Sequence, residues 1–301
     1  MHIGFKTGPK NWEEGKRIIT QDGAKMCEIW FRVDKVHEYR EMLGYLKAQK
    51  VAFGLHYWGL IQNKYKPNIA THHKDIREET IAQMKEAIDV AQREDAVYVN
   101  IHPGILSVEE MNFTTHRQAV SSNHEVTPSD TARTITHENV NILHDYALKK
   151  GVTLTIETLP AGEVPGSDRE EAYFPGDAPI SLLQDLADNG FYIANDITHT
   201  ASQIGLINSE DAFLWKHLLD TTHSLAPQTK LVHVNTVVPP WNGTDSHHGL
   251  LPEDYAVNAW PSLDRIAQLI SIFKDRDDVY IVPEPNHNMQ ENYQALVKLI
   301  A

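Results

Sequence analysis

The sequence has few of the features that mark secreted and membrane proteins. Its 301 residues include one cysteine, Cys27, so no disulfide can form within the chain, and this fits a reducing compartment. No apolar run approaches the roughly 18–20 residues that a membrane span needs. The first residues also lack the basic stretch followed by an apolar one that a secretory signal would show. We therefore expect a cytoplasmic protein that does not contact a membrane.

Motifs of several common enzyme classes are missing as well. The segment after the first apolar run, Thr7-Gly8-Pro9-Lys10, does not match the GxGxxG turn of dinucleotide-binding sheets. There is no Walker loop and no GxSxG nucleophile turn. The net charge of −14 excludes a uniformly basic nucleic-acid-binding surface, although bound divalent cations can reverse the local field inside a carboxylate-lined pocket.

What the sequence does contain is a regular series of short apolar runs. Most are apolar at consecutive positions, which is typical of strands buried on both faces. Eight runs are predicted as strands: His2–Lys6, Met26–Phe31, Val51–His56, Val97–His102, Val152–Glu157, Phe191–Asp196, Leu231–Asn235 and Val279–Glu284.

Segments with helical periodicity lie between these runs. One of them ends in two lysines followed by Gly151, a cationic last turn with a terminating glycine. Strands that alternate with helices predict a (β/α)8 TIM barrel, a single α/β domain over residues 1–301, with a doubly wound open sheet as the alternative. The predicted helices are Asp75–Arg93, Asp130–Lys150, Pro179–Asn189, Glu210–Leu225, Ser262–Arg276 and Glu291–Ile300.

Three of the strand-to-helix connections are long, whereas the helix-to-strand connections are short. The long ones are Pro103–Ser129, Thr158–Ala178 and Thr236–Pro261. Long irregular loops in a compact domain usually build sites, so we expect all three at the C-terminal mouth of the barrel. Whether the first of them forms a lid is left open.

Histidine, aspartate and glutamate residues stand at or just after the ends of most predicted strands. The C-terminal ends of barrel strands converge on one mouth, so residues far apart in sequence can share a site. A carboxylate after an apolar strand is costly to bury unless it is paired or bound to metal. Nine such residues are too many for one ion and predict a multi-metal centre: His56, His102, Glu157, Asp196, His199, His233, Asp245, His247 and Glu284.

The types of these residues bear on the metal. Carboxylate and imidazole ligands without thiolate suit zinc, manganese or iron, and the share of histidine favours zinc. Each residue also has an ordinary structural alternative, such as an ion pair or a helix cap for a carboxylate and a hydrogen-bonded core position for His56 or His102. Aromatic residues near the predicted mouth could stack on a sugar or a base, or simply pack under the loops: Tyr57, Trp58, Tyr173 and Trp241.

The nine residues and their neighbours resemble the endonuclease IV and xylose-isomerase-like superfamily of TIM barrels (AP endonuclease family 2). The resemblance runs from the first strand to Glu284 and is carried by His102-Pro103-Gly104, Ile156-Glu157-Thr158, Asp196-Ile197-Thr198-His199, His233-Val234-Asn235 and Asp245-Ser246-His247-His248. It implies one ion at His56, His102 and Glu157, a second at Glu157, Asp196, His233 and Glu284, and a third at His199, Asp245 and His247.

The endonuclease IV branch implies metal-dependent phosphodiester hydrolysis, with DNA cut 5′ to an abasic site. Two departures leave this substrate open: the run after the seventh strand is Thr236-Val237-Val238, and no long polar loop follows the second strand. The alternative is a sugar or sugar-phosphate isomerase or epimerase, in which Glu157 and Glu284 exchange a carbon-bound proton. A non-catalytic binding barrel is the third candidate. The oligomeric state is left open.

Overall fold

The computed structural model describes residues 1–113, 117–161, 178–243 and 246–301. Its main sheet is parallel and closes through the N-terminal segment. Strand β1 (His2–Ile3) pairs with β11 (Tyr280–Pro283), and β2 (Phe5–Thr7) pairs with β3 (Met26–Arg32). β1 and β2 are two parts of one interrupted strand. Together they join β11, the last strand, to β3 and complete an eight-stranded barrel. The predicted TIM barrel is confirmed.

The other strands follow in chain order around the sheet, and all pairs are parallel. They are β4 (Ala52–Trp58), β5 (Val99–Ile101), β8 (Leu154–Glu157), β9 (Tyr192–Asp196) and β10 (Thr229–Val234). Each predicted strand is present, with ends that differ by at most two residues because the limits of an apolar run need not coincide with those of the hydrogen-bonded ladder.

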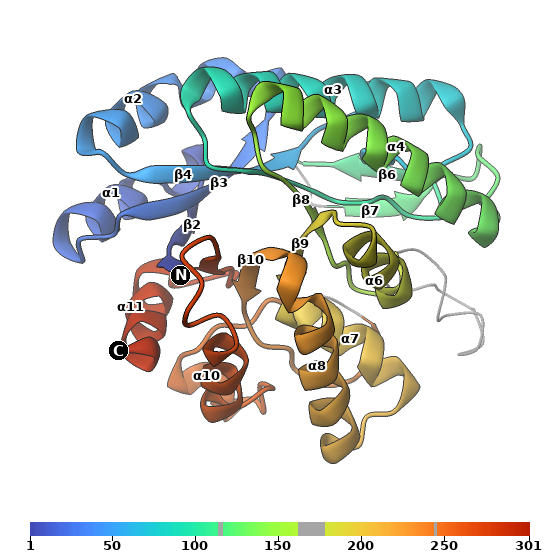
Figure 1. Cartoon of the computed structure of the whole chain (residues 1–301). Coiled ribbons are helices and arrows are strands. Elements are labelled where there is room, and N and C mark those ends of the chain that lie inside the picture. The colour runs from blue at the N-terminus through green and yellow to red at the C-terminus, as the bar shows by residue number, and fades with distance from the viewer. Residues whose placement is uncertain (114–116, 162–177, 244–245) are drawn as a thin grey trace.

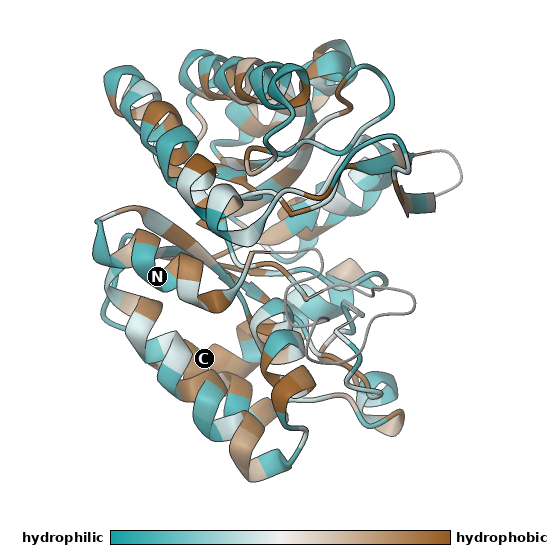
Figure 2. Cartoon of the chain, turned by 90° about the vertical axis from the view of Figure 1, so that its right-hand side faces the viewer, coloured by the Kyte–Doolittle hydropathy of each residue, from teal (hydrophilic) through white to brown (hydrophobic). Residues whose placement is uncertain are grey.

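Helices surround the sheet, and the two ends of the chain lie near one another (Figure 1). Figure 2 shows teal and brown alternating along many of the helices, as expected for helices with one polar and one apolar side. Within the described residues, none of the helices has the length and apolar character to cross a bilayer. The helices are α1 (Trp12–Gln21), α2 (Arg40–Gln49), α3 (Lys74–Glu94), α4 (Ser129–Lys150), α6 (Ile180–Asp188), α7 (Ile197–Ile207), α8 (Asp211–Leu225), α9 (Pro252–Ala256), α10 (Leu263–Ser271) and α11 (Met289–Ile300).

The long connection Pro103–Ser129 contains structure that the apolar pattern did not predict. Strands β6 (Glu109–Asn112) and β7 (Arg117–Val120) pair antiparallel in it. Their residues are mostly half-buried or exposed, so they lack the continuous apolar character used to find the barrel strands.

The interior of the barrel is divided into an apolar floor and a polar upper part. The floor is formed by inward-facing side chains of several strands: Met26, Tyr98, Ala194, Leu231 and Val282. The ring of Tyr98 fills space that Gly54 leaves open, because a Cβ placed on Gly54 would lie 2.1 Å from that ring. Above this floor, the inward positions carry charged and polar side chains, which places a polar site at the C-terminal mouth.

Candidate metal centre

Eight of the nine predicted ligand residues come together at the C-terminal mouth, as the strand-end pattern implied. The ninth, Asp245, lies outside the described residues. Six of the eight are buried, and His102 and His247 are partly exposed toward the opening. The arrangement produces overlapping groups whose ligand-type atoms lie within 4.8 Å of one another.

One of these groups consists of Glu157, Asp196, His233 and Glu284, all of them buried. The Nδ1 atom of His233 lies 2.9 Å from Oε2 of Glu284, 3.2 Å from Oε1 of Glu157 and 3.7 Å from Oδ2 of Asp196. Three carboxylates that face one ring nitrogen in a water-poor interior need a cation among them.

A residue outside the predicted set fixes the orientation of His233. Nε2 of His233 donates a hydrogen bond to Oε2 of Glu28, at 2.7 Å. That bond leaves Nδ1 of the same ring directed at the carboxylates. A carboxylate that holds the far nitrogen of a metal-binding histidine is a common support in metal sites, because it fixes both the tautomer and the ring direction.

The charges of this group are tightly linked. Burial alone would lower the pKa of His233, but Glu28, Glu284 and Glu157 raise it well above its ordinary value. Burial would likewise raise the pKa of Glu157 and Glu284, yet His233 and further cationic neighbours hold both well below the usual range. Without metal, a protonated His233 is therefore the cation that these carboxylates require.

A second group joins His56, His102 and Glu157. The Nε2 atoms of the two histidines are 3.1 Å apart, and they lie 3.3 and 3.5 Å from Oε2 of Glu157. Two nitrogen or oxygen ligands of a tetrahedral zinc ion stand about 3.3 Å apart, so this spacing by itself suits an ion. Burial lowers the pKa of His56 to about 3, with a further contribution from the nearby Lys6.

A third group contains Asp196, His199 and His247. Nδ1 of His199 donates to the carbonyl of Thr158 at 2.6 Å, and Nδ1 of His247 lies 2.8 Å from the carbonyl of Glu284. Since a carbonyl only accepts, His199 carries its proton on Nδ1, and its Nε2 faces Nε2 of His247 at 3.2 Å. This placement of Nε2 atoms suits an ion separate from the one among Glu157, Asp196, His233 and Glu284.

His199 reaches this position from the first turn of a helix. Helix α7 begins at Ile197, directly after the last residue of β9. Oδ1 of Asp196 accepts from the backbone N–H of His199 at 2.9 Å and from the Thr198 hydroxyl at 2.8 Å, so Asp196 caps the helix. The cap leaves Oδ2 of Asp196 toward His233, which allows one residue to serve both the helix and the cluster.

Two charged residues of the centre were not predicted, Lys6 and Glu28. Both are fully buried, and they pair at 2.7 Å across neighbouring strands β2 and β3. Lys6 also lies 2.9 Å from Oε1 of Glu284. Each stands within a barrel strand, Lys6 one residue before the end of β2 and Glu28 at the third position of β3. A charge in the middle of a buried strand was the signal that could have identified them.

The aromatic side chains at the mouth are only partly those expected. Trp58 packs edge-on against His102, with ring centroids 5.1 Å apart, and is beside the site. Tyr57 is buried and donates to Gln83 of α3, Trp241 packs against Trp260, and Tyr173 lies outside the described residues. Trp30, not predicted, is 39% exposed and donates from Nε1 to Oε1 of Glu284 at 3.2 Å.

The residues fit a divalent metal by a structural criterion. Among the described residues, buried Oε2 of Glu284 has no hydrogen-bond partner, although it lies 2.9 Å from Nδ1 of His233. An ion among Glu157, Asp196, His233 and Glu284 would satisfy that oxygen and replace the proton on His233. The donors are oxygen and imidazole nitrogen, which suits zinc or manganese equally, so the metal predicted from sequence stays a prediction.

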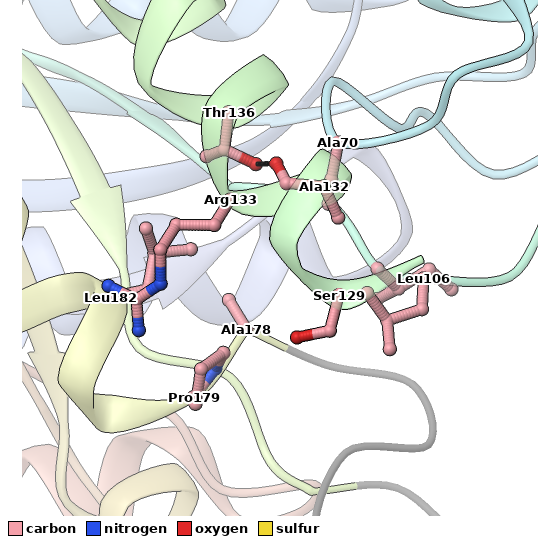
Figure 3. Close-up of a pocket in the computed structure, with 11 residues that line it drawn as sticks. Ala70, Leu106, Ser129, Ala132, Arg133, Thr136, Ala178, Pro179 and Leu182 are labelled. Atoms are coloured by element: carbon pink, nitrogen blue, oxygen red, sulfur yellow. Dashed lines mark hydrogen bonds between the residues drawn. The ribbon is translucent and has the colours of Figure 1, made fainter. Parts of the chain in front are cut away.

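A separate hollow lies between α4 and α6. It is lined mainly by apolar side chains and backbone, including Ala70, Leu106, Ala132 and Leu182 (Figure 3). Of the described residues that line it, Arg133 alone is charged, and this side chain is bound to Asp185 and to Ser181. None of the ionisable residues of the mouth lines this hollow, so the candidate chemistry belongs to the mouth.

Comparisons with known proteins agree with this architecture. A family model described as xylose isomerase-like TIM barrel matches residues 17–265. No curated protein sequence matches the chain. The similarity to characterised proteins therefore rests on the family pattern and on structure.

Three solved structures illustrate the range of similar barrels. A putative xylose isomerase from Rhodospirillum rubrum has a TM-score of 0.66 at 15% identity, with 100% of this chain and 98% of that chain covered. The 3-keto-D-glucoside 4-epimerase of E. coli has a TM-score of 0.64 at 14% identity, with 99% and 98% covered. Endonuclease IV from Thermus thermophilus has a TM-score of 0.55 at 16% identity, with 100% and 97% covered. At these identities the similarity establishes the fold.

Proposed function

Because the chain belongs to the xylose isomerase-like TIM barrel family, we propose that it is a metal-dependent isomerase or epimerase of a sugar or sugar phosphate. The observation that carries the proposal is the group of Glu157, Asp196, His233 and Glu284, which surrounds one cation position at the floor of the mouth. Similar structures include several sugar epimerases, which supports the same choice.

Glu157 and Glu284 are the proposed proton-transfer groups. Their lowered pKa values mean that both are ionised at neutral pH, and ionisation is the state that a proton acceptor requires. In the proposed reaction, one carboxylate removes the proton beside the substrate carbonyl, and the electron pair of the broken C–H bond moves toward the carbonyl oxygen. Return of a proton to the opposite face of that carbon gives an epimer. Return to the neighbouring carbon, with transfer of the hydroxyl proton between the two oxygens, gives an isomer. A divalent ion bound at this position would polarise the substrate oxygens.

Hydrogen bonds hold these two carboxylates in place. Glu157 accepts from the side-chain amide of Asn100, and Oε1 of Glu284 accepts from Trp30 and lies beside Lys6. A carboxylate held in this way loses little entropy when the substrate arrives, and its direction toward the reacting carbon is set in advance.

Trp30 and Trp58 add a surface for the substrate. They come from adjacent strands β3 and β4, and Trp30 touches the proposed base Glu284 while Trp58 touches His102. Flat aromatic faces beside acidic and amide groups suit a small polyol ring, which presents C–H groups on one face and hydroxyl groups at its edge.

An endonuclease IV-like phosphodiesterase is the second candidate. The observation in its favour is the close spacing of His56, His102 and Glu157, which would supply an additional ion position. The net charge of −14 offers no matching support for a DNA substrate.

The two candidates are separated by assaying the same metal-loaded protein on both substrate classes. One arm is a panel of ketoses, aldoses and their phosphates, analysed for new stereoisomers, and the other is a duplex with one synthetic abasic site. Zinc- and manganese-loaded protein is compared with a chelated control. We expect chelator-sensitive conversion of a sugar. Chelator-sensitive nicking of the duplex, with no sugar converted, would contradict the proposal.

A further inference from the structure

Lys6 occupies an unusual place in the mouth. Besides the groups described above, Glu28, His56, His233 and Glu284 also bring four ligand-type atoms within 4.8 Å of one another. Nζ of Lys6 contacts three of these four residues, at 2.7 Å from Glu28, 2.9 Å from Glu284 and 2.5 Å from Nδ1 of His56. This cation position is therefore already filled by a side chain of the protein.

These contacts also determine which nitrogen of His56 carries a proton. An ammonium group has three N–H donors and no acceptor, so all three protons of Lys6 are directed at Glu28, Glu284 and His56. Nδ1 of His56 must then be the acceptor. A neutral imidazole with an accepting Nδ1 carries its proton on Nε2.

A protonated Nε2 cannot bind a metal ion. In His56 this atom points at Nε2 of His102, 3.1 Å away, and at Oε2 of Glu157, 3.3 Å away. The short distances in this group are thus accounted for by a hydrogen bond that His56 donates. The chain of hydrogen bonds runs from Lys6 through His56 to His102 or Glu157.

We propose that Lys6 is a built-in cation that fills one cation position and withdraws His56 from metal binding, so that no ion is held by His56, His102 and Glu157. In this proposal Lys6 is a positioning residue: it directs Oε1 of Glu284 and the ring of His56. The proposal rests on the proposed function for an ion at Glu157, Asp196, His233 and Glu284, and it does not depend on the identity of the sugar.

Metal content provides a test that does not require activity. Four forms of the full-length protein are saturated with zinc or, separately, manganese, freed of unbound metal, and analysed for metal ions per chain by elemental mass spectrometry. They are wild type, Lys6→Met, His102→Ala and the Lys6→Met/His102→Ala double variant. The surface variant Lys74→Met is the control for loss of a lysine, because Lys74 is 74% exposed and contacts only Glu78 of its own helix among the ion pairs described.

The expected pattern has four parts. His102→Ala keeps the wild-type metal content, because His102 binds no ion while Lys6 is present. Lys6→Met gains one ion per chain, the double variant returns to the wild-type value, and Lys74→Met is unchanged. Loss of one ion from His102→Ala, or no gain in Lys6→Met, overturns the proposal.

A second variant covers the case in which Lys6→Met fails to fold because the buried carboxylate of Glu28 loses its ammonium partner. Lys6→Met/Glu28→Gln removes both charges while nearly preserving side-chain volume. His56 is again free to bind through Nε2, so one additional ion that depends on His102 is expected relative to Glu28→Gln alone, which has the same weakened support of His233. Absence of that ion from the folded variant contradicts the proposal. Wild type that binds no ion would instead overturn the proposed function.

Discussion

His233 and Glu28 form a buried hydrogen-bonded pair, with Nε2 of the histidine 2.7 Å from Oε2 of the glutamate. The bond joins β10 to β3 across the barrel interior and turns Nδ1 of His233 toward Glu157, Asp196 and Glu284. A residue that binds no ion itself thus sets the direction of a proposed ligand.

Replacing Glu28 should therefore weaken metal binding while the proposed ligands remain. We expect Glu28→Gln to reduce metal affinity by about 10–100-fold, the usual effect of losing such a supporting carboxylate. Calorimetric titration of the metal-free protein measures the change. Glu13→Gln on α1, at a side chain 79% exposed, is the matched control. Equal affinities in both variants would mean that Glu28 does not orient His233.

Metal binding should release a proton from His233. The pKa of its imidazole is raised well above the ordinary value in the metal-free protein, so the ring is charged at neutral pH and must lose its proton before Nδ1 can bind an ion. Affinity should consequently rise with pH until that pKa is passed.

Titration in buffers of different ionisation enthalpy measures this release. We expect the binding enthalpy to vary with the ionisation enthalpy of the buffer, with a slope that corresponds to close to one proton released per bound ion. The opposite result would be a binding enthalpy that does not depend on the buffer, together with an affinity that does not change between pH 6 and 8, roughly the range in which an ordinary histidine loses its charge. That result would be incompatible with a protonated His233.

The eight-strand pattern was sufficient to predict the barrel and to gather the candidate site. Apolar runs that end in His or Glu, such as the one ending at Glu157, identify both a buried strand and a residue at its mouth. The hairpin β6–β7 was not predicted because its residues lack that apolar signal. Lys6 and Glu28 were missed because charges within apolar runs give no sign of their partners, and the register that pairs them comes only from the folded sheet.

His102→Ala should distinguish the two candidate activities. An isomerase with its ion at Glu157, Asp196, His233 and Glu284 should keep substantial activity in this variant, within about tenfold of wild type if only a mouth contact is lost (about 1.4 kcal/mol at most). A phosphodiesterase that needs an ion at His102 should lose its activity. Steady-state kinetics on whichever substrate class is converted gives the result, with His223→Ala at an exposed position of α8 as the control.

Gly54→Ala should destabilise the barrel. The added Cβ would lie 2.1 Å from the ring of the buried Tyr98, so the floor of the barrel must shift, at a cost of about 1–3 kcal/mol or more. Gly44→Ala in α2 is the matched control, because nothing lies within 4 Å of its added Cβ and alanine favours a helix. Urea unfolding should show a loss for the first variant and a small gain for the second. Equal stabilities would contradict close packing of Tyr98 on Gly54.

The most direct measurement of the proposed function is deuterium incorporation into the sugar during turnover in heavy water. Metal-loaded wild type should place one deuterium on the carbon to which the proton returns, and Glu157→Gln and Glu284→Gln, measured at saturating metal, should reduce the rate by about 100-fold or more. A direct hydride shift also gives turnover without deuterium incorporation. The two variants therefore decide between proton transfer by the carboxylates and a hydride shift. Sugar conversion that continues at the wild-type rate in both metal-loaded variants would contradict proton transfer by Glu157 and Glu284.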